Sequence, residues 1–426
     1  MKRISSKALA MILAGSLTAV MPTAAQAAKK KEEAAQTEQR VPSPTKAYAE
    51  GYNKTVNLLQ AGDFAGAKTA YDASAGSVTA PNDMYWAGNV AIQLGSKTSD
   101  QALQKSGIQM VLDSGLASPE ENSRYSFFAG QFAYQDKDYA KAVEYLQRAY
   151  EAGYRDNDIA TTLAEANNNA GDSAAALKWL NTAIDDRKAA GQTVPENWFK
   201  RGAALALDAK NGTEASIWLG RLVQAYPDQT NWRDTLVVYR DGVNLTTQEN
   251  LDLMRLMRQV GALKSERDYG EYVDAADPRR LPGEVVAVID EASANGVSNS
   301  TYLNEQRKVA QGNVSGDKAG LAGAEKDARS ASTGKTAAVT ADAYLGYGDY
   351  AKAADLYTVA LEKGSVDADE IHTRRGIARA QSGDKSGAME DFDAVQSGNR
   401  EAIADYWKLY LEKGTTAAVA AAAAAS

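Results

Sequence analysis

The sequence offers few side chains for chemistry, because it has 1 histidine and no cysteine among its 426 residues. A catalytic triad would need His372 aligned with a serine and a carboxylate, and the chain has no Gly-x-Ser-x-Gly turn to expose such a serine. A zinc site would have to use carboxylates almost alone. We therefore interpret His372 as a helix-surface residue, and we expect neither thiolate chemistry nor disulfides.

Three other patterns resemble ligand sites but lack something that the chemistry requires. Gly334-Lys335-Thr336 could end a phosphate-binding loop, but Arg329 occupies the position where that loop needs a glycine. Neighbouring acids such as Asp185 and Asp186 point about 100° apart on a helix, so they do not converge as an acid/base pair. The pair Asp367 and Asp369 lacks the glycine and the distal glutamate of a calcium loop. The sequence therefore predicts no catalytic residue, no cofactor and no metal.

The first residues have the pattern of a secretory signal peptide. A basic start precedes an apolar run at residues 8–20, and small residues at Ala25 and Ala27 suit cleavage after Ala27. A membrane anchor is the alternative, but this run is too short to cross about 30 Å of hydrocarbon. A lipoprotein anchor would need a cysteine. We expect residues 1–27 to be removed and the protein to be exported to the periplasm.

The net charge disfavours nucleic acid and anionic lipid as partners. It is -8 for the whole chain, and removal of the three basic residues of the signal peptide would make it -11. Hydrophobic residues make up 44% of the sequence, many of them alanine, and there are only 9 prolines. This composition favours closely packed helices over sheets as the elements that position any binding residues.

One turn pattern recurs along the chain and indicates a repeat. Glycine and aspartate, usually followed by an aromatic residue, precede a helix that carries an alanine near its start. The alanines Ala142 and Ala176 are 34 residues apart, and Ala353 and Ala388 are 35 apart. Ala67 and Ala102 give 35 as well. A helical hairpin repeated at this interval predicts an array of stacked hairpins.

The residue types explain how such a hairpin would form. Glycine favours the left-handed backbone that ends the first helix, and aspartate accepts hydrogen bonds from the free amides that begin the second. A small residue on the first helix lies twelve positions before the alanine, as in Gly130 before Ala142 and Gly376 before Ala388. Small residues at both positions would let the two helices approach closely.

These residues resemble the tetratricopeptide repeat family, most closely from Ser123 through Gly153 and from Ala341 through Gly398. The resemblance implies an all-α fold, a tetratricopeptide-type α-solenoid in which antiparallel helix pairs form a right-handed superhelix. It also implies that the first helices line a concave, partner-binding groove. Together with the signal peptide, the pattern is similar to that of exported bacterial members of the family.

The predicted organisation has six parts. They are the signal peptide (1–27), a flexible linker (28–45), an N-terminal repeat array (46–229), degenerate helical repeats (230–311), a C-terminal repeat array (312–414) and an alanine-rich tail (415–426). The degenerate section is interpreted as a continuation of the array, because Ser216 and Ala353 are 137 residues apart, close to four repeat lengths. A separate inserted domain is the alternative.

The resemblance also predicts which side chains face the groove. On the first helices of three repeats they are Tyr85, Asn89, Arg124, Phe127, Gln131, Gln135, Thr161, Glu165 and Asn168. The amides could bind an extended peptide backbone, and the rings of Tyr85 and Phe127 could form apolar pockets. Arg124 alone does not make the basic cluster with which some family members hold a chain terminus, so an internal peptide or a glycan is expected. Alternatively, this row only closes the stack.

We therefore expect a non-enzymatic periplasmic scaffold that binds a protein or peptide partner in cell-envelope assembly or export. One alternative is a helper in polysaccharide secretion. Another is a cell-wall glycan hydrolase that uses two of the carboxylates Glu249, Glu271 and Glu284 in the degenerate section.

Overall fold

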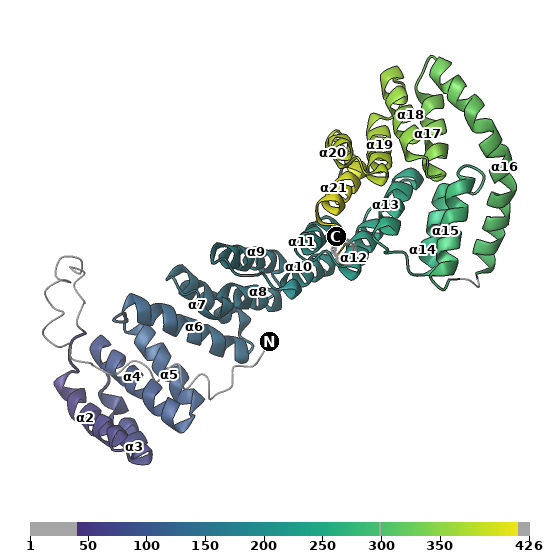
Figure 1. The fold of residues 1–426 in the computed structure, drawn as a ribbon. Helices are drawn as coiled ribbons and strands as arrows, with labels where there is room; N and C mark the ends of the chain where they lie inside the picture. Colours follow the sequence, from purple (N-terminus) through teal and green to yellow (C-terminus); the bar gives the residue numbers. More distant parts are fainter. Residues whose placement is uncertain (1–40, 298–299, 416–426) are drawn as a thin grey trace, which may run out of the picture. The chain divides into compact units, whose positions relative to one another are not determined.

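The structure, a computed structural model, describes residues 41–297 and 300–415 of the chain. Every regular element in these ranges is a helix, so the prediction of an all-α fold is confirmed (Figure 1). None of the described helices is long and apolar enough to cross a membrane. The predicted signal peptide, most of the predicted linker and nearly all of the alanine-rich tail lie outside the described residues.

The chain divides into two compact units between residues 193 and 194. Unit 1 contains the helices α2 (Lys46–Gln60), α3 (Phe64–Ser74), α4 (Pro81–Thr98), α5 (Gln101–Asp113), α6 (Pro119–Gln135), α7 (Tyr139–Glu151), α8 (Ile159–Asn169) and α9 (Ser173–Ala189). Two short 3-10 turns lie at Ala75–Ser77 and Asp156–Asp158. The helices pair as α2 with α3, α4 with α5, α6 with α7 and α8 with α9, and each pair packs on the next. Unit 1 is therefore a stack of four helical hairpins.

The hairpin turns have the predicted chemistry. The carboxylates of Asp63, Asp138 and Asp172 each accept a hydrogen bond from the backbone amide three residues on, at the start of α3, α7 and α9. The residues before Asp63 and Asp172 are glycines with positive φ. The Asp138 turn adopts the same backbone with Lys137, at φ 62°. The turn signal read from the sequence is thus confirmed.

Small residues form the contacts within the hairpins. Ala142 is 0% exposed, and a Cβ atom on Gly130 would lie 2.6 Å from Leu146 Cγ. The α4–α5 pair departs from the predicted register, because Ala102 is exposed and Gly88 instead faces Gly107 across the interface. The interpretation of Ala102 as the packing alanine is therefore wrong. Helix α4 continues to Thr98, so the turn before α5 comes late and the close contact moves along α5 to Gly107.

The end of the predicted linker is held against α4. The backbone amide and the hydroxyl of Thr45 both donate to the carboxylate of Asp83, at 2.7 and 2.9 Å, and Asp83 is 0% exposed. The indole of Trp86 donates to the carbonyl of Pro42 at 2.9 Å. Residues 41–45 are therefore an ordered strap, which differs from the flexible character predicted for residues 28–45.

The described residues of unit 2 form twelve helices. They are α10 (Glu196–Asp208), α11 (Gly212–Ala225), α12 (Gln229–Gly242), α13 (Thr247–Gln259), α14 (Glu266–Ala276), α15 (Pro282–Ala294), α16 (Thr301–Ser330), α17 (Lys335–Gly346), α18 (Tyr350–Lys363), α19 (Ala368–Ser382), α20 (Lys385–Asp393) and α21 (Gly398–Lys413). The predicted boundary at residues 229–230 falls inside unit 2, and the one at 311–312 falls inside α16. Residues 230–311 share one continuous apolar core with the helices that follow them.

Unit 2 closes on itself, because its last helix packs against its early ones. Helix α21 contacts α11, α13 and α19 (Figure 1). The Trp232 indole on α12 donates to the carbonyl of Gly414 at 3.0 Å, and the Tyr239 hydroxyl donates to the carbonyl of Asn399 at 3.1 Å. Helix α13 lies at the centre of this closure, and its residues 251–257 are all buried.

Helix α16 spans 30 residues, far more than the other helices, and it is anchored mainly near its ends. Its buried residues are Leu303, Ala310 and Ala328, with none between the last two. Four glycines lie in that middle stretch, and a Cβ atom added to any of them would meet nothing within 4 Å. Close packing therefore does not explain these glycines.

Two glycine-to-alanine changes in unit 2 should have opposite effects on stability. Gly320→Ala on α16 is expected to raise the free energy of unfolding by about 0.5–1 kcal/mol, because alanine favours the helix and meets open space. Gly376→Ala on α19 should lower it by about 1–3 kcal/mol, because the new Cβ would lie 2.6 Å from the ring of Phe392. Urea unfolding of both variants measures this. Equal effects would contradict the packing described for α16 and α19.

Candidate functional site

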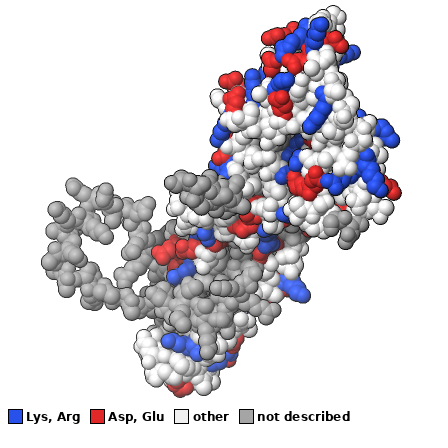
Figure 2. All heavy atoms as spheres, turned by 45° about the vertical axis from the view of Figure 1, so that its right-hand side comes forward, with Lys and Arg blue, Asp and Glu red and all other residues white. Residues whose placement is uncertain are grey.

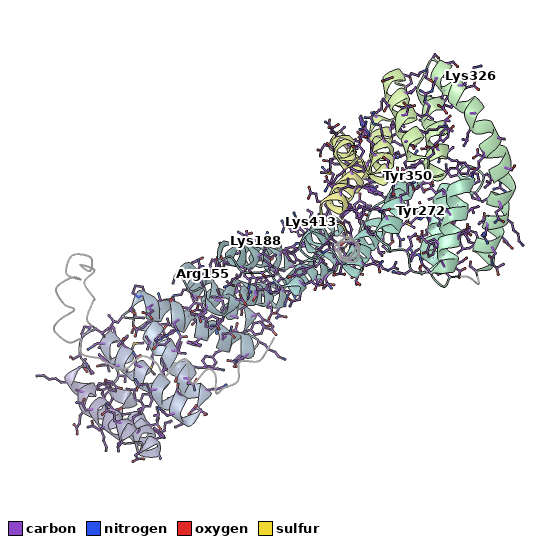
Figure 3. All side chains as sticks on the ribbon, in the orientation of Figure 1. Arg155, Lys188, Tyr272, Lys326, Tyr350 and Lys413 are labelled. Atoms are coloured by element: carbon purple, nitrogen blue, oxygen red, sulfur yellow. The ribbon has the colours of Figure 1, made fainter. Side chains whose placement is uncertain are left out.

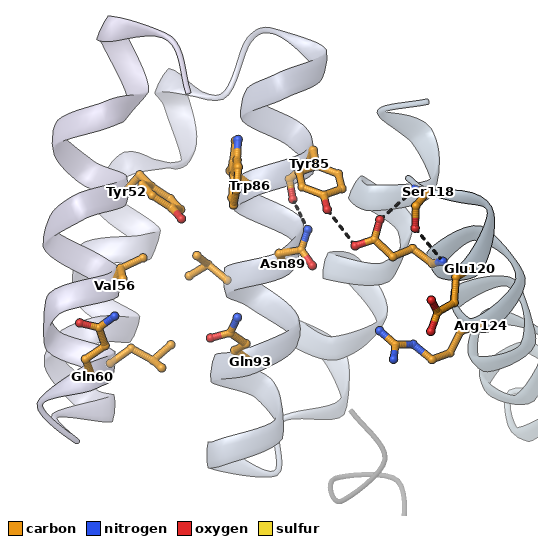
Figure 4. Close-up of a pocket in the computed structure, with 13 residues that line it drawn as sticks. Tyr52, Val56, Gln60, Tyr85, Trp86, Asn89, Gln93, Ser118, Glu120 and Arg124 are labelled. Carbon is orange, nitrogen blue, oxygen red and sulfur yellow. Dashed lines mark hydrogen bonds between the residues drawn. The ribbon is translucent and has the colours of Figure 1, made fainter. Parts of the chain in front are cut away.

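The candidate site in unit 1 is a pocket of about 450 Å³ between α2, α4 and α6, called here the α2–α6 pocket (Figure 4). These are the first helices of three successive hairpins, so the pocket lies on the face where the repeat resemblance predicts a groove. Its lining residues are Tyr52, Val56, Leu59, Gln60, Tyr85, Trp86, Asn89, Val90, Gln93, Ser118, Glu120, Glu121 and Arg124.

An aromatic row forms one part of the pocket. The Trp86 ring packs edge to face against two tyrosine rings, with its centroid 5.7 Å from that of Tyr52 and 5.4 Å from that of Tyr85. The hydrogen bond from the Trp86 indole to Pro42 fixes the orientation of its ring. With Val56 and Val90 nearby, these rings offer an apolar surface that needs no rearrangement to accept an apolar side chain.

The side-chain amides in the pocket differ in how many of their hydrogen-bonding groups are unused. Asn89 donates to the carbonyl of Tyr85 at 3.0 Å and accepts from the Tyr125 hydroxyl at 3.2 Å, so most of its capacity is used inside the protein. The side-chain amides of Gln60 and Gln93 form no hydrogen bond with any residue of the described ranges. They line the pocket one helical turn beyond Val56 and Asn89. These two glutamines, rather than Asn89, are free to bind a peptide backbone.

The charged side chains lie on α6. Glu121 accepts hydrogen bonds from the Tyr85 hydroxyl and from the backbone amide of Ser118, both at 2.8 Å, which hold its carboxylate in place. Burial raises the pKa of Tyr85, and this neighbouring carboxylate raises it further, so the hydroxyl stays protonated. The Arg124 guanidinium lies over the Tyr125 ring and forms no ion pair within the described chain, and its Nε atom is buried without an acceptor.

The structure brings together three of the nine predicted groove residues. Tyr85, Asn89 and Arg124 line the pocket. Phe127 does not offer an apolar surface as predicted, because it is 1% exposed beneath the stacked ring of Tyr154, 4.4 Å away between centroids. Gln131 is also buried. The prediction that these two side chains face the groove is therefore corrected.

The other four predicted residues lie outside the pocket. They are Gln135, exposed at the end of α6, and Thr161, Glu165 and Asn168 on α8. Thr161 donates to the carbonyl of Asp158, and Glu165 accepts from the Tyr134 hydroxyl at 3.5 Å. Sequence reasoning missed the contribution of α2. The spacing of Tyr52, Val56 and Gln60, four residues apart on one helix face, could have revealed it.

The carboxylates considered for glycan hydrolysis each have a structural role in unit 2. Glu249 caps α13 and bonds to Asn399, and Glu271 pairs with Arg240 and Arg267. Glu284 is buried and accepts two hydrogen bonds from Arg255 and one from the Tyr272 hydroxyl. These contacts leave none of the three poised for acid/base catalysis.

The one histidine is also held in a structural cluster. The Nδ1 atom of His372 lies 3.0 Å from the carboxylate of Asp391, which is 1% exposed. Arg375 and Arg379 donate to the same carboxylate. The prediction of a plain surface position is thus incomplete, because His372 is partly buried. Within the described ranges, no group of three or more metal-ligating side chains occurs.

A buried cluster of charges, called here the Asp252 cluster, joins five helices of unit 2. Asp252 on α13 is 0% exposed and accepts from Arg255 at 2.8 Å, Arg374 at 3.2 Å and Arg400 at 2.6 Å. Arg255 also forms an ion pair with Glu284 on α15, and Arg374 also forms one with Asp342 on α17. The cluster ties α13 to α19 and α21, the helices that close the unit.

The Asp252 cluster should make unit 2 sensitive to acid. Burial alone would raise the pKa of Asp252, but the positive charges of Arg374, Arg400 and Arg255 have the larger effect and lower it. The pKa of Glu284 is lowered in the same way, chiefly by Arg255. Because the folded-state pKa values lie below the unfolded ones, the stabilisation is complete above about pH 5 and is lost as pH falls below about 4. Urea unfolding at a series of pH values measures this, and Asp252→Asn should flatten the acid slope. Stability unchanged down to pH ~3 would contradict the assignment.

Ion pairs at the surface contribute much less. Acidic and basic side chains are interspersed on the face shown in Figure 2. The pair between Lys105 and Asp136 has its two side chains 32% and 56% exposed. Such pairs are screened by solvent and typically add less than about 1 kcal/mol.

Stacked helical hairpins with a small-residue seam and an aspartate-capped turn define a helical-repeat protein, and the groove residues lie on its first helices. A family model described as tetratricopeptide repeat matches residues 111–158, 133–195 and 339–405. Residues 111–195 and 339–405 therefore form tetratricopeptide repeats, and the described chain has a tetratricopeptide-type α-solenoid fold, as the resemblance implied.

Comparison with other proteins gives only distant likenesses. No curated protein matches the sequence. The C-terminal part of a TPR repeat-containing protein from Cytophaga hutchinsonii is 11% identical with a TM-score of 0.31, and covers 62% of this chain and 93% of its own. A tetratricopeptide repeat protein from Parabacteroides merdae is 15% identical with a TM-score of 0.25, covering 68% and 98%. The PilF protein of Pseudomonas aeruginosa is 14% identical with a TM-score of 0.24, covering 62% and 97%.

Proposed function

We propose that this protein is an exported, non-enzymatic scaffold that binds an internal segment of a protein partner in the α2–α6 pocket. The observation that carries the proposal is the combination, in one pocket, of a preformed aromatic row and two glutamine amides with no partner among the described residues. An apolar side chain of the partner would lie against Tyr52 and Trp86. Its backbone would bond to Gln60 and Gln93.

The sequence supports the compartment and the process. The pattern of residues 1–27 favours export to the periplasm, and a scaffold there would serve cell-envelope assembly or export. Catalysis receives no support from the described residues, because the carboxylates and the histidine considered above are engaged in structural contacts. Cell fractionation and N-terminal sequencing test the export: the mature chain should begin at Ala28, and a cytoplasmic chain that retains Met1 would contradict it.

The double variant Gln60→Ala/Gln93→Ala should weaken partner capture without affecting the fold. Each lost amide removes hydrogen bonds worth about 0.5–1.5 kcal/mol, so recovery of the partner should fall by about 5-fold or more. The measurement is quantitative pull-down from envelope extract with the full-length mature chain as bait, checked by circular dichroism.

Gln135→Ala is the matched control, because Gln135 is an exposed glutamine that was predicted to face the groove but does not line the pocket. Partner recovery should be unchanged in this variant. Equal recovery with all three baits would show that the pocket is not the binding site. Loss with Gln135→Ala alone would restore the row first predicted from the sequence.

A further inference from the structure

Unit 2 contains a second, larger cavity of about 660 Å³, which the proposed function does not use. It lies beneath the middle of α16, where that helix has no buried residue, and Val314 and Lys318 of α16 face it. Helices α13, α15, α17 and α19 supply most of the other walls, and α14 and α18 contribute one residue each. Figure 3 shows Tyr272 and Tyr350, both lining residues, on the inner side of α16. A cavity of this volume is within the size range of small-molecule sites.

The hydrogen-bond acceptors that line the cavity are largely satisfied. The Glu284 carboxylate accepts three hydrogen bonds, two from Arg255 and one from Tyr272. Glu291 accepts from Arg258 Nε at 2.6 Å. The side-chain oxygen of Gln259 accepts from Gln381 at 2.7 Å. These contacts use most of the acceptor capacity of Glu284 and part of that of Glu291 and Gln259.

Several hydrogen-bond donors that line the cavity, in contrast, have no acceptor among the described residues. Arg258 uses only its Nε atom, so its two terminal nitrogens have no acceptor in the part of the chain that the structure describes, and its side chain is 33% exposed. Lys318 has no carboxylate partner within the described ranges; its ammonium group lies 4.9 Å from the centre of the Tyr347 ring. The Tyr350 hydroxyl likewise has no hydrogen-bond partner among the described residues. Unused guanidinium, ammonium and hydroxyl donors around one cavity require a ligand rich in acceptors.

The aromatic side chains of the cavity are not arranged for a sugar. The Tyr347 hydroxyl donates to Asp317 at 2.7 Å, and Lys318 covers the ring. The opposite helix also crowds this ring, since a Cβ atom on Gly283 would lie 2.2 Å from Tyr347 Cε1. Tyr272 is buried. A sugar would need an open ring face for stacking, whereas Tyr347 instead positions the ammonium group of Lys318 toward the cavity.

We propose that this cavity binds a small organic anion, with its oxyanion held by Arg258 and Lys318 and a short apolar body against Val286, Val314 and Ile377. The carboxylate of Glu284 is paired with Arg255. The carboxylate of Glu291 is paired with Nε of Arg258 itself, so the ligand would bind the two terminal nitrogens that this pair leaves unused. The apolar side chains come from α15, α16 and α19, so the ligand would bridge α16 to the rest of unit 2.

Isothermal titration of the full chain with three probes tests the proposal. Hexanoate carries an oxyanion on an apolar body, hexanamide is its neutral counterpart, and inorganic phosphate is an anion without an apolar body. Hexanoate should bind at least about 10-fold more tightly than hexanamide and than phosphate. If neither anion binds below about 10 mM, the proposal is wrong. Equal binding of hexanoate and hexanamide would refute the role of the two cations, and phosphate binding as tight as hexanoate would refute the apolar part.

Variants locate the bound anion. Lys318→Met removes an exposed charge and should weaken hexanoate by about 5–10-fold, and Arg258→Gln should weaken it by about 10-fold or more. Lys326→Met is the matched control, because Lys326 is an exposed lysine near the far end of α16 that does not line the cavity (Figure 3). The affinity of Lys326→Met for hexanoate should match that of the unchanged protein. Unchanged hexanoate affinity in Lys318→Met, whose exposed position makes misfolding no explanation, would overturn the site.

Discussion

Replacing Asp252 by alanine is expected to lower the free energy of unfolding of unit 2 by about 3–5 kcal/mol, a large part of the roughly 5–15 kcal/mol that stabilises a typical folded protein. The variant would remove the carboxylate that Arg255, Arg374 and Arg400 share, and leave these buried arginines with only their outer partners. A buried charge without its partner costs far more than the pair contributes. Urea unfolding and amide hydrogen exchange of α13, α19 and α21 measure the loss.

Two variants make this experiment specific. Asp252→Asn keeps the shape and some of the hydrogen bonds, so it should be destabilised less than Asp252→Ala. Asp355→Ala breaks an exposed pair with Arg329, whose side chains are 55% and 46% exposed, and should cost less than about 1 kcal/mol. If Asp252→Ala lost no more free energy of unfolding than Asp355→Ala, the Asp252 cluster would not be what holds unit 2 closed.

Replacing Trp407 by alanine is the second change expected to have a large effect, about 3–5 kcal/mol. This side chain on α21 is 0% exposed, and its ring is stacked on Phe392 and meets Tyr410 edge to face, at 6.0 Å in both cases. Its indole also lies 3.5 Å from the carbonyl of Asp252. Removing it leaves a cavity where the last helix packs on α13, so α21 should detach first.

Amide hydrogen exchange distinguishes detachment of α21 from a general loss of stability. In Trp407→Ala, protection should fall in α12, α13 and α21, while α14 and α15, which do not contact α21, should lose less. Trp407→Phe retains an aromatic ring in the core and should lose about half as much stability as the alanine variant. Uniform loss across all helices of unit 2 would contradict the closure by α21.

The local features of the fold could be predicted because their causes lie within a few residues of one another. The turn of Asp63 and the turn of Asp172 each depend on a glycine with positive φ and a carboxylate that caps the next helix. Both requirements are readable from the sequence as residue types in order. The pairing of Gly130 with the helix that carries Ala142 follows from the same spacing.

The groove could be predicted only in part, since it depends on helix register and on neighbouring loops. Phe127 has the right position on α6 to face the groove, but Tyr154, which follows α7, covers it. No pattern within α6 reveals that cover. Because α4 is longer than expected, Gly107 makes the close contact that was expected of Ala102. Tyr85 and Asn89 kept their predicted place because they lie before the end of α4, where the change occurs.

The closure of unit 2 had no local signal. Asp252 meets Arg374 and Arg400, which are 122 and 148 residues further along the chain. In a sequence, an aspartate or arginine on an amphipathic helix reads as a solvent-exposed residue, and only the full set of partners makes its burial favourable. The apolar residues Leu251 and Met254 fit one face of a helix, but their spacing alone cannot show that both of its faces are covered.

The ring closure in unit 2 has a consequence for the order in which the two units fold. Unit 1 is built from contacts between successive hairpins, so its structure can grow hairpin by hairpin while later parts of the chain are still unfolded. Unit 2 cannot complete its fold until Arg400 and Trp407 are available, because its central helix finds its last partners only then. Its assembly is therefore a single late event dominated by distant contacts, which should make it the slower half to mature and the one that depends most on an intact carboxyl end.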